Sequence, residues 1–175
     1  PVLPAGVETD WQIIGRDTTD QIEVLLAALS KKIIDSYIEV CTIVGLNVVA
    51  IEPAVFANTR IIDPEQLEGK NVLLVYVGDR FVTFSYITNG NPRFSDFLLD
   101  PKMQKDGDII KTVESYVNFA NSKHEDRKVS EIIISGFNPQ IENLVKALVA
   151  SKLPAVLAKS RLTTPITLPR SFTPP

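Results

Sequence analysis

The chain has 175 residues, 18 Lys and Arg against 21 Asp and Glu, a formal charge of −3, one Cys and one His. These counts exclude an internal disulfide, a Cys-based metal cluster and a multi-His metal site. The length predicts one domain or two small lobes, and 45% hydrophobic residues suffice for a core.

Charge and hydropathy narrow the classes of partner. Residues 1–100 hold 7 Lys and Arg against 14 Asp and Glu, whereas residues 101–175 hold 11 against 7. The basic residues of the second half are scattered and lack interleaved aromatic side chains, so we do not expect nucleic-acid binding. No run of about 18 apolar residues exists and the start shows no signal-peptide pattern, so we expect neither membrane insertion nor export.

The first half predicts a small β-β-α-β-α unit. Two strands, 11–15 and 22–29, are expected to pair, and the second is aliphatic enough to be largely buried. A helix follows, with Ser30 as its N-cap and Gly45 as its end. The segment 47–51 is predicted as a further strand. A second helix is predicted from Pro53 to residue 60, and the polar stretch 63–70 marks a lobe boundary.

The second half predicts a β-β-β-α-β-α-β unit. Three antiparallel strands, 71–77, 81–87 and 93–99, are separated by a Gly78-Asp79 turn and an Asn89-Gly90 turn. A helix over about 105–122, a strand at 129–135, a helix opened by Asn138 and Pro139, and a strand near 153–158 complete it. Such an order is typical of the ribonuclease-H-like architecture, a mixed sheet with helices on its faces. We expect the Pro-rich residues 161–175 to form an extended tail.

Two turns of the second unit are candidate nucleotide-binding sites. The first, around Gly78, Asp79 and Thr83, lies where actin-like proteins place a phosphate loop, but Tyr76 stands where the Mg²⁺-orienting Asp is expected. The second, Ser135-Gly136, joins a strand to a helix and is able to accept a phosphate or adenosine group. A plain hairpin turn and an ordinary strand-to-helix turn remain the simpler interpretations of the two segments.

Cys, His and Trp each occur once in the chain, and we interpret the three residues structurally. Cys41 falls on the apolar stripe of the first predicted helix, so we expect an inert core thiol. His124 lies in a polar loop, where a surface role is expected. Trp11, near the start of a strand, is either an aromatic residue at the edge of the core or, if exposed, part of a partner surface.

The segments of the first unit resemble those of a known family. Five segments carry the resemblance: Asp10-Trp-Gln-Ile-Ile-Gly15, Glu23-Val-Leu-Leu-Ala-Ala28, Ile34-Asp-Ser-Tyr-Ile-Glu39, Val44-Gly-Leu46 and Ala50-Ile-Glu-Pro-Ala54. Together they resemble the inserted subdomain of PilM-type, FtsA/actin-like pilus-assembly proteins, and with the second unit the resemblance covers about residues 8–158. It implies an actin-like fold with a small subdomain at 8–62 and a ribonuclease-H-like lobe at 70–160.

The departures from the family pattern concern the nucleotide motifs. The family's first phosphate loop would precede Pro1, its second is Tyr76-Val-Gly78 here, and its Gly-Gly adenosine motif is Ser135-Gly136-Phe137. The connection from Leu99 to Ile109 is too short for the family's fourth subdomain. The resemblance therefore implies a truncated or reduced relative with no resident cofactor and no hydrolytic activity.

As a function, the resemblance implies a cytoplasmic adaptor of type IV pilus or type II secretion-like assembly. Such a protein lies at the inner membrane through a membrane-anchored partner resembling PilN, whose cytoplasmic tail it binds, and it also contacts other subunits of the assembly. Trp11 and Tyr37 are our candidate partner-binding residues, because aromatic anchors dominate peptide sites. Two alternatives remain open: an actin-fold ATPase that binds ATP and Mg²⁺ through Gly78, Asp79, Thr83, Ser135 and Gly136, and a self-associating structural protein.

Overall fold

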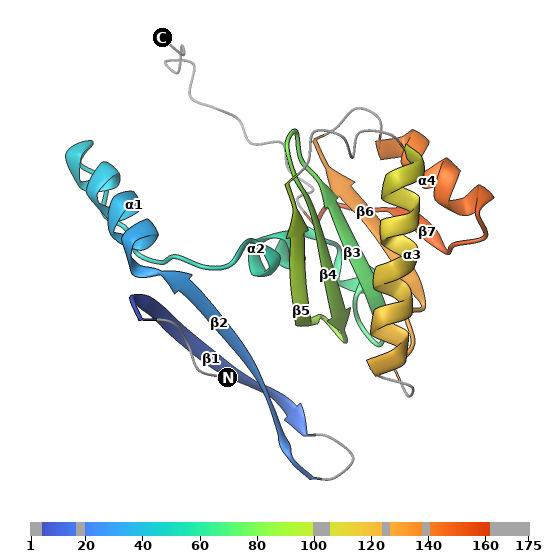
Figure 1. Cartoon of the computed structure of the whole chain (residues 1–175), viewed down its shortest axis with the longest axis horizontal. Helices are drawn as coiled ribbons and strands as arrows, with labels where there is room; N and C mark the ends of the chain where they lie inside the picture. Colours follow the sequence, from blue (N-terminus) through green and yellow to red (C-terminus); the bar gives the residue numbers. More distant parts are fainter. Residues whose placement is uncertain (1–4, 17–19, 100–105, 124–126, 138–140, 162–175) are drawn as a thin grey trace.

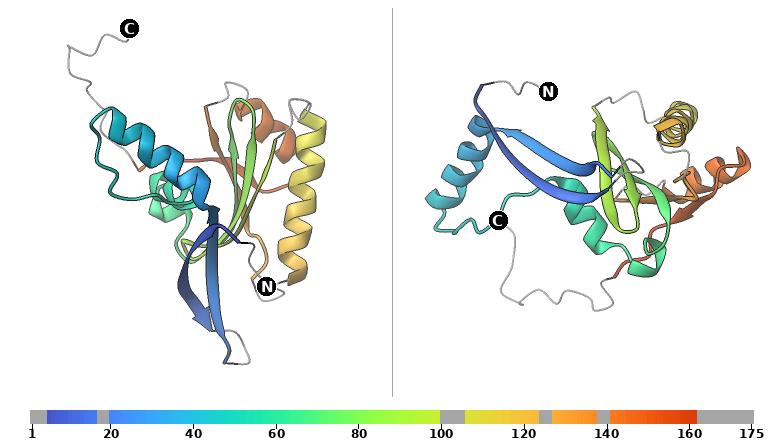
Figure 2. Two further views of the ribbon diagram at one scale, coloured as in Figure 1. Left: turned by 60° about the vertical axis from the view of Figure 1, so that its left-hand side comes forward. Right: turned by 90° about the horizontal axis from the view of Figure 1, so that it is seen from below.

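The computed structural model describes residues 5–16, 20–99, 106–123, 127–137 and 141–161. A five-stranded sheet has helices α3 and α4 on one side, while a two-stranded hairpin and helices α1 and α2 lie on the other (Figure 1). Figure 2 shows from two further directions that the hairpin and α1 project away from the sheet. The predictions for His124, Asn138 and Pro139 lie outside the described residues, as does the predicted tail from residue 162 on.

The hairpin pairs two strands as the sequence predicts. Strand β1 (Val7–Arg16) runs antiparallel to β2 (Ile22–Ser30), with a bulge between Ile13 and Gly15. The expectation that the second strand is largely buried is wrong, because one face of it, with Val24 and Leu26, is exposed. The alternation typical of strands is present, but no layer of the described chain covers that face.

Helix α1 (Lys31–Ile43) begins and ends close to the predicted residues. Ser30 occupies the N-cap position without a capping side-chain hydrogen bond. At the other end, Gly45 has a φ of +76°, its amide donates to the Thr42 carbonyl, and Leu46 donates to Cys41. These bonds form a Schellman motif, which requires the left-handed conformation that glycine adopts easily. The helix buries no residue, so the expected core position of Cys41 is wrong; its free thiol is half-buried.

The predicted strand at 47–51 does not form. These residues are in an irregular segment, and Val49 is 90% exposed. The four apolar residues 48–51 suit a buried strand, but a strand also needs a neighbouring edge to bond, and no described strand pairs with this segment. Helix α2 (Ala54–Ile61) follows with Pro53 at its N-cap.

The sheet confirms the predicted ribonuclease-H-like order. Its strands run β5-β4-β3-β6-β7, with β3, β4 and β5 antiparallel and β6 and β7 parallel to β3. The elements are β3 (Asn71–Val77), β4 (Val82–Thr88), β5 (Asn91–Leu98), α3 (Asp106–Lys123), β6 (Glu131–Gly136), α4 (Ile141–Ala150) and β7 (Ala155–Leu157). The two parallel connections each pass through a helix, as parallel strands require.

Both faces of this sheet are covered, which explains its continuous apolar strands. On one face, Leu73, Val75 and Phe84 pack with α3 and α4. On the other face, Val72 and Leu74 pack with Ile62 and Leu67, from the segment that follows α2.

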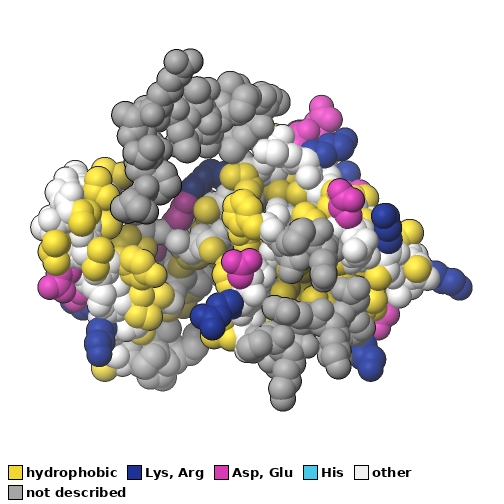
Figure 3. Space-filling view, turned by 90° about the horizontal axis from the view of Figure 1, so that it is seen from above, with side chains coloured by type: hydrophobic (Ala, Val, Ile, Leu, Met, Phe, Trp, Pro, Cys, Tyr) yellow, Lys and Arg dark blue, Asp and Glu magenta, His cyan; other side chains and the backbone are white. Residues whose placement is uncertain are grey.

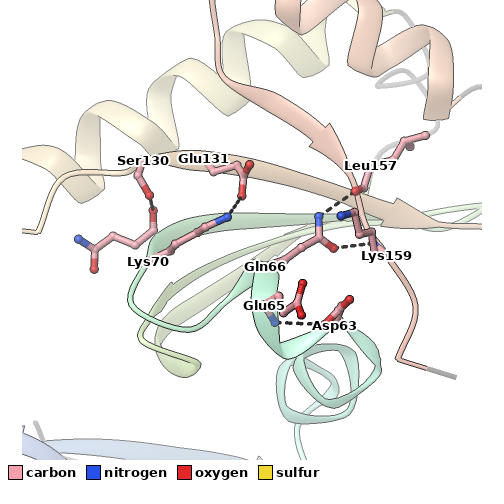
Figure 4. Close-up of polar contacts among 9 residues, drawn as sticks. Asp63, Glu65, Gln66, Lys70, Ser130, Glu131, Leu157 and Lys159 are labelled. Atoms are coloured by element: carbon pink, nitrogen blue, oxygen red, sulfur yellow. Dashed lines mark hydrogen bonds and ion pairs between the residues drawn. The ribbon is translucent and has the colours of Figure 1, made fainter. Parts of the chain in front are cut away.

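The polar segment 63–70 is fixed to the sheet rather than loose. It contains a 3-10 turn (Pro64–Gln66), with the Asp63 side chain accepting a hydrogen bond from the Glu65 amide. The buried Gln66 side chain donates to the Leu157 carbonyl and accepts from the Lys159 amide (Figure 4). The segment therefore forms a pinned connection between α2 and the sheet.

Candidate functional site

The turn after β3 is closed by its own aromatic side chains. The Gly78 amide donates to the Phe81 carbonyl at 2.9 Å, so this amide is used within the turn. The Phe81 ring covers Gly78 so closely that a Cβ on the glycine would lie 2.9 Å from it. Tyr76 stacks on Phe81 at 5.9 Å between ring centroids and meets Phe137 edge-on at 6.3 Å.

The five predicted nucleotide-contact residues do come together at one end of the central strands, where β3 and β6 end and β4 begins. Thr83 lies opposite Tyr76 on the neighbouring strand, and Ser135 and Gly136 lie opposite Tyr76 and Val77 on the other side. Asp79 is exposed. At Gly136, whose φ is +135°, a Cβ would lie 2.1 Å from the Val77 carbonyl oxygen, so glycine is required by the close approach of two strands. That approach accounts for Gly136 without a ligand.

The groups that bind and hydrolyse a nucleotide are few at this end of the strands. A phosphate loop needs free backbone amides, and a hydrolytic site needs a carboxylate that orients a metal-bound water. Here aromatic rings cover the turn, and the residue at the expected carboxylate position is Tyr76. No group of three or more potential metal ligands occurs within the described part of the chain.

A groove lies between the hairpin and the segment that leads into α2. Its volume is about 650 Å³, within the range of binding sites for small ligands and peptide side chains. One wall is the consecutive stretch 8–12 of β1, and the other is formed by residues 51–54 with Phe56. The floor is formed by apolar residues of β2 and α1, namely Leu25, Ala27, Ala28, Leu29 and Ile34.

The charges around the groove are acidic at its lining and basic outside it. Glu8, Asp10 and Glu52 line the groove, with no Lys or Arg. Arg60 donates to Glu52, and this hydrogen bond lowers the pKa of the Glu52 carboxyl. Lys31 pairs with Glu8 at 3.3 Å, and the bond to Glu8 raises the pKa of the Lys31 ammonium. The Asp10 carboxylate accepts a hydrogen bond from the Trp11 amide at 2.8 Å and forms no ion pair with any Lys or Arg side chain that the structure describes.

The two predicted partner-binding residues lie in different places. Trp11 lines the groove and is 63% exposed. Tyr37 lies on α1, is 68% exposed and is not part of the lining. Leu25, Leu29 and Phe56 line the groove but were not predicted as site residues. For Leu25 and Leu29, the signal was the two-residue alternation of the second strand, which we had assigned to a buried core. Phe56 of α2 has no such signal in the sequence.

An ionic cluster joins the hairpin, which forms one wall of the groove, to the sheet. Glu23 of β2 accepts hydrogen bonds from Arg93 of β5 at 2.6 Å and from Arg127 at 3.2 Å. The three side chains are 12% to 21% exposed. Gly15 lies against them, since a Cβ there would be 3.3 Å from the Glu23 carboxylate. The cluster links the hairpin to the edge strand of the sheet.

Many apolar side chains of the hairpin and α1 are exposed. Figure 3 shows apolar side chains gathered on the side of the molecule where α1 lies. Those on the hairpin and α1 are all at least 40% exposed: Trp11, Ile13, Ile22, Val24, Leu26, Leu29, Ile33, Tyr37, Ile38, Val40 and Ile43. An exposed apolar patch of this extent marks an interaction surface in a stable protein. Within the described residues, no helix is long and apolar enough to cross a bilayer.

The comparisons with known proteins agree with the fold. No family model and no curated protein matches the chain. Among solved structures, it is similar to a chain of the "PilM-PilN type IV pilus biogenesis complex", with a TM-score of 0.64 and 12% identity over 89% of this chain. A protein with an actin-like ATPase fold from Bacteroides thetaiotaomicron also matches, with a TM-score of 0.43, 11% identity and 89% coverage of this chain. The chain has an actin-like fold, and it spans 57% and 55% of these two chains.

Proposed function

We propose that the chain is a non-catalytic adaptor of type IV pilus or type II secretion-like assembly, which binds the cytoplasmic tail of a membrane-anchored partner resembling PilN. The observation that carries the proposal is the apolar groove beside the hairpin, with Trp11 at its wall. An extended peptide inserts apolar side chains into such a groove and bonds through its main chain.

The similarity to a solved PilM supports the choice of partner. That protein was solved in a complex with PilN, and its fold is shared by this chain over 89% of the residues. On this proposal the protein works in the cytoplasm, at the inner membrane through its partner, and contacts further subunits of the assembly.

Binding of a tail can be measured directly because Trp11 is the single tryptophan of the chain. The probe is a synthetic peptide of the cytoplasmic segment of the PilN-like protein from the same organism. Burial of a 63% exposed indole should shift its fluorescence to shorter wavelength in a saturable way. A scrambled peptide is the control. No saturable shift, together with no heat of binding by calorimetry, would contradict the proposal.

The proposal also excludes nucleotide hydrolysis. It is supported by the closed Gly78 turn and by Tyr76 at the carboxylate position. Mg-ATP or Mg-ADP at 100 times its dissociation constant would stabilise a binding protein by about 2.7 kcal/mol. We expect no rise in melting temperature with either nucleotide. A rise that is abolished by Gly78→Asp would instead favour the actin-fold ATPase.

The exposed apolar surface of the hairpin and α1 favours self-association as a second candidate function. The adaptor proposal predicts a monomer at micromolar concentration. Sedimentation velocity over a concentration series separates the two, because a self-associating chain would show a concentration-dependent dimer.

A further inference from the structure

Helix α1 has two apolar faces. Ile34 is half-buried and lines the groove, so it belongs to the inner face. Four further residues recur at intervals of four, three and four, which places them together on one side of the helix. They are Ile33, Tyr37, Val40 and the C-cap residue Val44. Each is 47% to 68% exposed and none lines the groove, and we call the four the outer face of α1.

The outer face is left uncovered by the described part of the chain. Helix α1 buries none of its residues, although its sequence is mainly apolar. A helix of 13 residues is marginal in water by itself, and helices in proteins gain most of their stability by packing an apolar face. The exposed surface continues past the helix, since Leu46 is 63% and Val49 is 90% exposed. We therefore expect this face to pack against another molecule.

The charges beside the outer face are acidic. Residues 33–59 contain no Lys or Arg, but they contain Asp35, Glu39 and Glu52. Asp35 pairs with Lys31 at 3.5 Å, whereas Glu39 forms no ion pair with any Lys or Arg side chain that the structure describes. A partner that carries Lys or Arg beside its apolar side chains is therefore favoured.

These charges argue against a membrane surface and against a second copy of the chain. Helices that lie on membranes carry Lys and Arg on their polar face, which attract anionic lipids. The run 33–59 has neither. When two copies of a helix pair antiparallel about a two-fold axis, residues near the middle of the face lie next to their own equivalents. Glu39 is close to that middle, so two carboxylates would repel one another there.

We propose that the outer face of α1 binds an amphipathic, basic helix of a second protein, at a site separate from the groove. The inference goes beyond the proposed function and does not depend on binding of the tail. From Ile33 to Val44 the face is about 16 Å long, or about three helical turns. A partner helix would pack apolar side chains at positions i, i+3, i+4 and i+7 against it, with a Lys or Arg beside Glu39.

A synthetic peptide tests the face directly. The probe is a helical peptide of about four turns, with Leu at positions i, i+3, i+4 and i+7 and Lys at the flanking positions. We expect saturable micromolar binding to the full chain by fluorescence anisotropy, and a loss of at least about fivefold for Val40→Ser. Val149 of α4 is 53% exposed against 61% for Val40, and Val149→Ser should lose less than about twofold. No saturable binding, or equal losses for the two variants, would overturn the inference.

Glu39→Gln tests the charge preference. We expect the affinity for the Lys-containing peptide to fall about two- to fivefold, the effect of one exposed ion pair. The same peptide with Gln in place of Lys should bind the variant and the wild-type chain equally. A loss that is equal for both peptides would overturn the basic character of the partner helix.

Saturating tail peptide separates this site from the groove. The affinity for the Lys-containing peptide should be the same with and without the tail peptide, because the outer face and the lining share no residue. Competition between the two would overturn the separate site and leave the proposed function standing. Binding of the Lys-containing peptide by a chain that binds no tail would contradict the proposed function alone.

Photo-crosslinking in cells identifies the native occupant of the face. Tyr37 is replaced by benzoyl-phenylalanine in the full-length protein, and the crosslinked segment is mapped by mass spectrometry. A basic, amphipathic helix of another protein is the expected product. Crosslinks to the chain itself would mean that a second copy covers the face, and crosslinks to lipid alone would mean a membrane. Either result, or the absence of any crosslinked product, would overturn the inference.

Discussion

The hairpin with α1 and the five-stranded sheet are built from similar amino acids but are covered to very different extents. Strand β3 contains Val72, Leu73, Leu74 and Val75, each 0% or 1% exposed. Strand β2 has an equally aliphatic run, yet Leu26 in it is 44% exposed. The difference lies in the neighbours, because β3 is central in a sheet with layers on both faces. Apolar content alone therefore does not tell whether a strand serves the core or a partner.

The hairpin and the sheet therefore differ in how they are stabilised. A two-stranded hairpin is at best marginally stable in water on its own, so it relies on what it is attached to. Here the attachment is the Glu23 cluster and the connection through α2 to the pinned segment 63–70. On the proposed function, the sheet supplies the stability of the molecule, and the hairpin holds an apolar surface in place for the partner.

A matched pair of leucine truncations breaks the comparison most directly. Leu73→Ala in β3 should lower the free energy of unfolding by about 2 to 5 kcal/mol, because it opens a cavity in a closed core. Leu26→Ala in β2 should change it by about 0.5 kcal/mol or less, since the side chain is already exposed. Urea denaturation of both variants measures this. Similar losses would mean that the hairpin face is covered in solution.

Trp11→Ala should show the reverse pattern, a large loss in binding with little loss in stability. An aromatic anchor in a groove contributes about 2 kcal/mol or more, so we expect tail affinity to fall about 30-fold. Calorimetric titration with the tail peptide measures it, since the variant has lost the fluorescent probe. Tyr37 is a similarly exposed aromatic residue outside the lining, so the tail affinity of Tyr37→Ala should fall by less than about threefold. A larger loss at Tyr37 would move the site to α1.

The sequence predicted the sheet well because its information is local. The Gly78-Asp79 and Asn89-Gly90 turns and the flanking alternation fix two hairpins, and Pro and Gly positions mark the ends of several elements. The groove was less predictable, because it depends on where the hairpin lies relative to α2. That placement comes from Glu23, Arg93 and Arg127, which are far apart in the chain and belong to no recognisable motif.

The same reasoning explains the two wrong expectations in the first half. Residues 47–51 have the composition of a strand, and β2 that of a buried strand. Composition predicts what a segment is able to form, whereas a strand edge to bond and a layer to cover it are supplied by other parts of the molecule. The predicted roles of Gly78, Asp79, Thr83, Ser135 and Gly136 in nucleotide binding remain predictions that the thermal-shift experiment tests.

Glu23→Gln tests the link between the two regions. The variant leaves two arginines beside a neutral amide, and we expect the free energy for opening the hairpin to fall by about 1 to 3 kcal/mol, less than for a fully buried pair. Amide exchange in β1 and β2 measures that opening. Arg16→Gln breaks an exposed ion pair in the same hairpin and should change the free energy for opening it by less than about 0.5 kcal/mol. Equal effects would show that the cluster does not anchor the hairpin.

The smallest expected effects concern pH, and they separate the regions by direction. In the groove, the bond from Arg60 lowers the pKa of Glu52 below 4.5, so this pair stabilises above that pH and its contribution disappears as the pH falls through the lowered value. In the lobe, burial and the hydrogen bond from Tyr116 to Asp96 raise the pKa of the Tyr116 phenol from 10 to about 12. Its contribution is complete below pH 10 and disappears as the pH rises toward 12.

Comparing the wild-type chain with each variant separates these two contributions from those of other titrating groups. The stability difference between wild type and Glu52→Gln should shrink on acidification below about pH 4.5, and should be constant through the alkaline range. The difference between wild type and Tyr116→Phe should shrink above about pH 10 and should be constant in acid. Because Glu52 is exposed and Tyr116 is only partly buried, the test is the direction of each change, measured by denaturant unfolding across pH. If the stability differences of both variants shrank at the same end of the pH range, the two pairs would not act independently in the two regions.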